Sequence, residues 1–273
     1  MNPLYQTNTR ITYYDLDCNG KIKLSALLRI VHVAADVNAK ELGAGYDNLA
    51  PLGMTFILQR FGVNIIRMPA YDEDVTIRTW PSDVSKGTFL RRGDMYDHSG
   101  TKVMEWASLW LLFDINARKV LRPSALPVPL PTLGDEGINI LPEKLTHPGD
   151  WGKEYFRYTH QATYRDVDTN MHMNNSIYGD LIGNAMFPVV DKGFRKDPHN
   201  LQGSQATEDS QQGETPHAAS NIPLFKQVQI NYLAEIRIGA TVEVVTRHDG
   251  DDGDRFYVIG ESEGRTAFIA RIN

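Results

Sequence analysis

The chain has 273 residues, of which 41% are apolar and 23% charged, and its formal net charge is −6. This composition is typical of a soluble globular protein with one large domain or two of about 100 to 150 residues. The negative charge argues against broad binding to nucleic acid or anionic membrane, and the single cysteine, Cys18, excludes an intrachain disulfide or a site built on several thiolates.

No apolar run approaches the roughly 20 residues that a membrane-spanning helix needs, and the N-terminal "MNPLYQTNTR" lacks the layout of a signal peptide. We therefore expect a cytoplasmic protein without a membrane or nucleic-acid partner.

The first distinctive segment is "TYYDLDCNGK", Thr12 to Lys21. A helical pattern follows it, with Ser25 as the expected N-cap and Gly43 as the expected stop. The apolar positions of this pattern, at i, i+3/4 and i+7 spacing, are Leu24, Leu27, Leu28, Val31, Ala34 and Ala35. Four segments rich in β-branched and aromatic residues come next and predict strands: "MTFILQRFGVNII", "DVTIRTW", "GTFLRRGDMYD" and "VMEWASLWLLFDI".

Residues 118–150 contain six prolines and predict a linker without regular structure. Beyond them the first segment nearly repeats as "TYRDVDTNMH", Thr163 to His172, with the shared frame T-Y-x-D-x-D-x-N. His172 stands where the first copy has Lys21.

A second helical pattern follows the second copy, with Asn174 or Asn175 as the expected N-cap. Its apolar positions are Ile177, Leu181, Ile182, Ala185, Met186 and Val189. A polar stretch from 191 to 223 predicts a mobile loop. Four further strands are predicted in "FKQVQINYLAEI", "ATVEVVTRH", "DRFYVIGES" and "TAFIARI". Each half is thus a strand, a long helix and about four strands, an α+β arrangement with antiparallel sheets.

The two copies are offset by 151 positions at the frame and by 167 at the later strands, Val75 against Val242. The second copy has therefore gained about 16 residues, which fit in the 191–223 loop.

Polar residues alternate in the second copy. If the segment is extended, Asp166, Asp168, Asn170 and His172 project from one face. The helix start behind them presents backbone N–H groups that suit an oxyanion. Asp and Asn also close turns and cap helices, so such a cluster has a purely structural interpretation. Since the first copy keeps the acidic frame without the histidine, we expect the frame to be structural in both halves and His172 to be the functional addition.

The string "DVDTNMHMNNSIY" resembles the D-x-N-x-H-V-N-N-x-x-Y motif of the acyl-acyl carrier protein thioesterases, the FatA/FatB type of plants and bacteria. The similarity extends from about Arg10 to Ile272, with the two irregular stretches excepted. It implies a tandem (double) hotdog: an N-terminal hotdog at 1–117 that shapes the acyl pocket, the linker at 118–150, and a catalytic hotdog at 151–273.

The resemblance implies hydrolysis of acyl-acyl carrier protein thioesters to free fatty acid, which terminates fatty acid synthesis. The partner would be acyl carrier protein with its phosphopantetheine-linked acyl chain, no cofactor or metal would be needed, and a homodimer is compatible with the family.

In the family a further acid lies in a segment like E-Y-R-R-E-C, which "INYLAEI" resembles, with Glu235 at the glutamate and Ile236 at the cysteine. Isoleucine is not a nucleophile, so we expect Glu235 to be the general base on a water. His172 and Asn170 would bind the water or polarise the carbonyl, and Asp168 would orient them.

Substrate binding is expected at Asn174 and Asn175. Arg91 and Arg92, with Arg60, Arg67 and Lys86, are expected to form a basic patch for the acidic carrier protein or the phosphate. His32, inside the first helix, is expected to be structural. Three alternatives stay open: an acyl-CoA thioesterase, a non-catalytic acyl-binding hotdog, and a dehydratase.

Overall fold

The computed structural model describes residues 2–85, 87–146, 154–190, 225–248 and 255–273. The polar stretch from 191 to 223 lies outside these residues. Within them, no helix combines the length and the apolar character that crossing a membrane requires.

The predicted elements are present in both halves. In the first half the elements are β1 Tyr5–Arg10, α1 Leu24–Glu41, α2 Tyr46–Leu49, β2 Met54–Ile65, β3 Asp74–Ser85, β4 Thr88–Asp97, β5 Lys102–Asp114 and the short β6 Lys119–Val120. In the second half they are β7 Glu154–Gln161, α3 Ile177–Val190, β8 Gln227–Tyr232, β9 Thr241–His248, β10 Phe256–Ser262 and β11 Arg265–Ile272. One predicted strand is too long, because β8 ends at Tyr232 and Glu235 lies in the loop beyond it.

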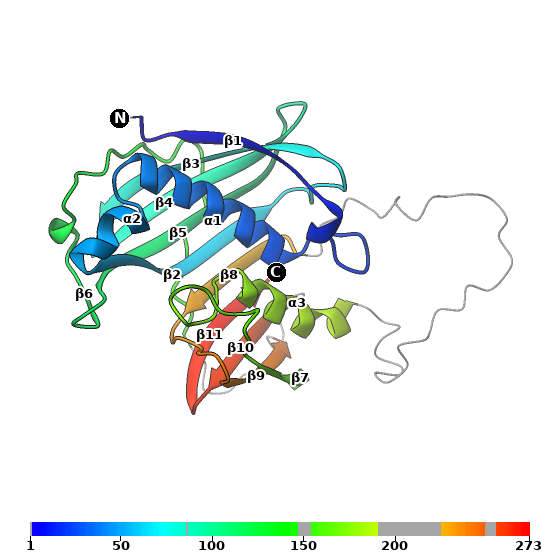
Figure 1. Cartoon of the computed structure of the whole chain (residues 1–273). Helices are drawn as coiled ribbons and strands as arrows, with labels where there is room; N and C mark the ends of the chain where they lie inside the picture. Colours follow the sequence, from blue (N-terminus) through cyan, green and yellow to red (C-terminus); the bar gives the residue numbers. More distant parts are fainter. Residues whose placement is uncertain (1, 86, 147–153, 191–224, 249–254) are drawn as a thin grey trace, which may run out of the picture.

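All strands belong to one antiparallel sheet, ordered β1-β3-β4-β5-β2-β8-β11-β10-β9-β7, with β6 beside β5. The halves meet where β2 pairs with β8, for example Phe61 opposite Ile230. Figure 1 shows α1 lying across the strands of the first half and α3 beside the strands of the second. The architecture is a double hotdog, as expected.

The strand register reproduces the offsets in the sequence. Thr9 of β1 lies opposite Val75 of β3, and His160 of β7 lies opposite Val242 of β9. His160 follows Thr9 by 151 positions and Val242 follows Val75 by 167, which are the two offsets found in the sequence. Equivalent positions of the two halves can therefore be named residue by residue.

The two helices approach each other closely at their N-terminal ends. A Cβ at Gly179 of α3 would lie 2.5 Å from the backbone nitrogen of Ser25, so only glycine fits there. The hydroxyl of Ser25 donates to Asp180 of α3. Ser25 is therefore not the N-cap that the sequence predicts: Lys23 takes that position, without a side-chain hydrogen bond. Gly43 does follow α1, with a φ of 74°.

The linker has almost no regular structure, as its prolines predict, yet it packs on the sheet. Ile138 and Ile140 form a buried cluster with Trp80, whose indole N–H donates to the Gly134 carbonyl at 2.9 Å. Further along, the backbone N–H of Leu145 donates to the Asn231 side chain at 2.9 Å. The linker thus spans from the first half to the second.

Candidate active site

The repeated frame folds as a closed loop in both halves. The Asp166 carboxylate accepts hydrogen bonds from the Thr163 N–H at 2.7 Å and hydroxyl at 2.9 Å, and Asp15 accepts the matching pair from Thr12 at 2.8 and 2.7 Å. An isolated bridge then closes each loop, Val167 with Met173 and Leu16 with Ile22. The segment is therefore not extended, because local side-chain bonds turn the backbone. Asp166 points into the loop instead of joining the others, whereas Asp168, Asn170 and His172 do line one cavity, as expected.

Asp166 is a buried structural carboxylate. Burial alone would raise its pKa, but the hydrogen bonds from Thr163 and the interaction with His160, whose Nε2 lies 3.0 Å from the carboxylate, outweigh burial and hold the pKa below its ordinary value. Asp166 stays ionised and serves the loop.

Asp168 also holds the loop. One carboxylate oxygen accepts the backbone N–H of Asn170 at 2.8 Å, as Asp17 accepts that of Asn19 at the same distance. The other oxygen lies 3.5 Å from the amide nitrogen of Asn174. Among the described residues, no hydrogen bond joins Asp168 to the ring of His172, so the expected orienting contact is absent here.

The two loops differ at their tips. Gly20 of the first copy has a φ of 71°, and Met171 takes the equivalent position with a φ of 63°. A side chain in this left-handed conformation is strained. Met171 precedes His172, so the strained residue lies next to the histidine that distinguishes the copies.

A cavity between the halves, here called the interface cavity, gathers several of the expected residues. Asp168, Asn170, His172, Asn175 and Glu235 line it from the second half. The first half contributes residues of α2, β2 and the loop after β5, namely Tyr46, Thr55, Phe56, Ile57, Leu58, Phe113, Ile115 and Arg118.

The segment that carries Glu235 lies directly beside the His172 loop. The N–H of Met173 donates to the carbonyl of Ile236 at 2.7 Å, and His172 forms an isolated bridge with Arg237. Ile236 is fully buried in the core. Two segments more than 60 residues apart in the sequence are thereby paired at the cavity.

The Glu235 carboxylate is held from the opposite half. It accepts a hydrogen bond from Arg118 at 3.0 Å, with Arg237 at 3.9 Å. Arg118 has a φ of 50° in the loop after β5. Sequence reasoning missed this residue, because an arginine at the start of a proline-rich linker gives no signal of a contact 117 positions away.

Tyr178, on the first turn of α3, also lines the interface cavity. Burial raises the pKa of its hydroxyl, and the nearby charges of Glu235 and Asp168 raise it further. The hydroxyl is thus a protonated hydrogen-bond donor at the edge of the cavity.

Backbone N–H groups at the start of α3 already have hydrogen-bond partners within the protein. The Asn174 side chain accepts the N–H of Ser176 at 3.0 Å, and its carbonyl accepts the N–H of Ile177 at 3.0 Å. Asn174 therefore caps the helix, does not line either cavity, and uses N–H groups that the sequence assigned to an oxyanion. Asn175 does line the interface cavity.

The expected basic patch does not form at the surface. Arg91 is buried, with 8% of its surface exposed. Arg92 donates to the hydroxyl of Ser82 at 3.1 Å and to the carbonyl of Ile138 in the linker. Arg67 is bound by Glu73, and Lys86 lies outside the described residues. The arginines are used inside the fold.

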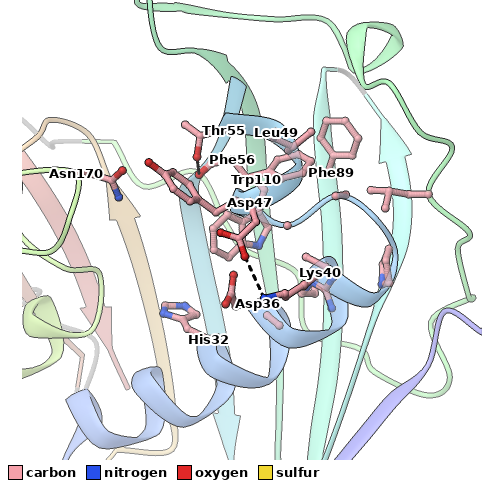
Figure 2. Close-up of a pocket in the computed structure, with 18 of the residues that line it drawn as sticks. His32, Asp36, Lys40, Asp47, Leu49, Thr55, Phe56, Phe89, Trp110 and Asn170 are labelled. Carbon is pink, nitrogen blue, oxygen red and sulfur yellow. Dashed lines mark hydrogen bonds and ion pairs between the residues drawn. The ribbon is translucent and has the colours of Figure 1, made fainter. Parts of the chain in front are cut away.

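A second cavity, here called the α1 cavity, lies under the C-terminal half of α1 (Figure 2). It shares Tyr46, Thr55, Phe56, Thr169 and Asn170 with the interface cavity, so the two cavities are adjacent. Its apolar lining is Ala35, Ala39, Ala44, Leu49, Phe89, Leu90, Trp110 and Leu130. A long apolar chain that enters at Asn170 can be buried here.

His32 lines the α1 cavity as well. Because the histidine lies on an apolar helix face, the sequence suggested only a structural role. In the described part of the chain, no group of three or more His, Cys, Asp or Glu side chains is arranged to hold a metal ion.

Comparison with known proteins shows similarity to one family model and to several solved structures. Residues 2–124 match the family model described as the acyl-ACP thioesterase N-terminal domain. Three solved structures superpose over nearly the whole chain. An acyl-ACP thioesterase from Bacteroides thetaiotaomicron has 18% identity, a TM-score of 0.69 and coverage of 99% of this chain and 97% of the other. An oleoyl thioesterase from Lactobacillus plantarum has 20% identity, a TM-score of 0.72 and coverage of 98% and 94%.

The third is a 12:0-ACP thioesterase from Umbellularia californica, with 16% identity, a TM-score of 0.68 and coverage of 100% and 97%. At these identities the superpositions establish the shared fold. No curated protein sequence matches the chain.

Proposed function

We propose that the chain, whose residues 2–124 match the acyl-ACP thioesterase N-terminal domain, hydrolyses acyl-acyl carrier protein thioesters to a free fatty acid and the carrier-protein thiol. The observation that carries the proposal is that His172, Asn170 and Glu235 line one cavity, beside a second cavity whose lining includes Leu49, Phe89 and Trp110. The thioester would lie in the interface cavity and the acyl chain in the α1 cavity.

Glu235 would act as the general base. It removes a proton from a water, the water oxygen attacks the thioester carbonyl carbon, and the carbon–sulfur bond then breaks as the thiol is protonated. His172 and Asn170 would donate to the carbonyl oxygen as it becomes negative, and such donors are worth about 3 to 4 kcal/mol each when they are preplaced. The hydroxyl of Tyr178 is a further donor at the same cavity.

A cysteine mechanism has no support in this geometry. Cys18 is exposed and lies in the first-half loop, and it lines neither cavity. Position 236, which aligns with the family's cysteine, holds a buried isoleucine.

Release of thiol from acyl groups of increasing length, each attached to acyl carrier protein or to coenzyme A, tests the proposal. We expect turnover with a higher kcat/KM for the carrier-protein series. A higher kcat/KM for coenzyme A would identify an acyl-CoA thioesterase instead. Saturable acyl binding without any thiol release would identify a non-catalytic acyl-binding protein.

A further inference from the structure

The floor of the α1 cavity contains a buried cation. Arg91 of β4 lines the cavity although only 8% of its surface is exposed. Its Nη1 donates to the side-chain oxygens of Asn38 at 2.8 Å and Thr79 at 3.2 Å. Both acceptors are neutral and almost fully buried. The guanidinium therefore lies under α1 with uncharged partners.

No carboxylate of the described residues forms an ion pair with Arg91. The cavity has two carboxylates, Asp47, which pairs with Lys40 at 3.0 Å, and Asp36 (Figure 2). Burial lowers the pKa of Arg91 to about 10, so the side chain is still charged at neutral pH. An uncompensated buried charge is costly, which makes an oxygen from a ligand favourable at this position.

Other polar groups lie along the same cavity. His32 has its Nε2 covered and without a hydrogen-bond partner, and burial lowers its pKa to about 4, so the ring is neutral. Asp36 follows His32 by one helical turn on the lining face of α1, as Figure 2 shows. Arg91 supplies donors and Asp36, which is exposed, supplies acceptors in a cavity whose lining is apolar around Phe89, Leu90 and Trp110.

The second half shows that the fold does not need this polarity. Arg91 lies opposite Pro81, and the residue 167 positions after Arg91 is Val258, which is fully buried. Val189, buried in the core, is equivalent to Asn38. At these two positions the second half thus has apolar side chains where the first half has an arginine and an amide. We infer that Arg91 and Asn38 serve the cavity and are not required by the fold.

We propose that the acyl chain taken by the α1 cavity carries a hydroxyl group remote from the thioester. A hydroxyl oxygen accepts from Arg91 while its hydrogen donates to Asp36 or to His32, which a methylene chain or a second carboxylate cannot do. The apolar lining buries the methylenes between the thioester and the hydroxyl. The inference rests on the proposed function, since it specifies the substrate of the same site.

Pantetheine thioesters of straight-chain acids and of ω-hydroxy acids, matched in length across a series, provide the test. At the best length we expect kcat/KM for the hydroxy compound to exceed that for the unsubstituted one at least about tenfold, because a hydrogen bond to a charged group has that effect. A chain-length series locates the hydroxyl, since only one length places it at Arg91.

Arg91→Met should bring the ratio of the two kcat/KM values toward one, and Arg91→Lys should keep part of it. Arg92→Met is the matched control, because Arg92 is adjacent but lines neither cavity, and its ratio should equal that of the wild type. Melting temperatures identify any variant that fails to fold. If a variant does not fold, the ratio of the two kcat/KM values in the wild-type enzyme still tests the proposal.

Binding of amide analogues of the same compounds, which hydrolysis does not consume, is measured in parallel. A hydroxyl preference in binding without any turnover would support the inference and overturn the proposed function alone. Equal turnover and equal binding of the hydroxy and unsubstituted compounds would overturn the inference and leave hydrolysis standing. A preference for ω-keto or ω-carboxy chains over hydroxy chains would also overturn it.

Discussion

The two halves contain the same T-Y-x-D-x-D-x-N frame, but the frame presents different residues in each half. Asp15 and Asp166 accept the same pair of hydrogen bonds, and both loops close with the same bridge. Only the second loop places a histidine and an asparagine in the interface cavity beside Glu235. The acidic frame therefore belongs to the fold, and we propose that the chemistry lies in the residues that the second loop presents.

The two helices also differ, and here the first half has the added feature. The second helix covers an apolar interior, whereas α1 covers a cavity with Arg91 and His32 in its lining. One half has gained reactive groups in its loop and the other has gained space under its helix. Exchanging or removing single residues at equivalent positions tests this division.

The largest effect is expected at the tips of the two loops. His172→Ala should lower kcat by about 10² or more, because groups that polarise a carbonyl or transfer protons contribute on that scale. Lys21→Ala, at the equivalent position, should leave kcat nearly unchanged. Steady-state kinetics on both variants, with melting temperatures to verify folding, gives the answer, and equal losses would mean that the halves are not divided as we propose.

A comparable loss is expected at Glu235. Glu235→Gln removes the base but keeps the size of the side chain, so kcat should fall about 10²-fold to 10⁴-fold with a smaller change in KM. Cys18→Ala, in the other half, should be almost fully active. An inactive Cys18→Ala enzyme beside an active Glu235→Gln enzyme would move the nucleophile to the first half.

Acid should destabilise the protein through His32, for which the second half has no counterpart because Gly183 is equivalent. Its pKa of about 4 in the folded protein lies below the ordinary 6.5, so the unfolded chain binds the extra proton. The free energy of unfolding should therefore fall as the pH drops from about 6.5 to about 4, by up to about 1.4 kcal/mol per pH unit from this group.

Urea unfolding across this range tests the effect. His32→Phe should flatten the slope relative to the wild type, while His98→Gln, at an exposed position, should keep it. An unchanged slope in His32→Phe would show that the ring is not held neutral in the folded protein.

The smallest effect is expected at the left-handed residues of the loops. Met171→Gly should raise the free energy of unfolding by up to about 1 kcal/mol, since glycine adopts this φ without strain. Gly20→Ala should lower it by about the same amount, although a Cβ there would meet no atom within 4 Å. Thermal denaturation measures both, and shifts of the same sign would refute the equivalence of the two tips.

The sequence predicts the helices, the strands and the duplication, because their periodicities are strong and occur twice. It does not predict that the frame is a closed loop, because Asp and Asn suit extended segments and turns alike until their hydrogen bonds are known. The β-like pattern continues past Tyr232, so the sequence does not reveal that the strand ends before Glu235. Arg91 and Arg92 resemble solvated strand residues, and only tertiary packing shows that Arg91 is buried and that Arg92 binds the linker.

The pairing of β2 with β8 has a consequence for folding during synthesis. Arg60 of β2 pairs with Asn231, so the first half is synthesised long before β2, its edge strand beside β5, has its second partner. Until then β2 presents a row of unpaired backbone groups, which is a template for pairing with another chain. We expect the isolated first half to self-associate along this edge, and we expect the joining of the halves to be the slow step of folding, because it closes the longest loop in the molecule.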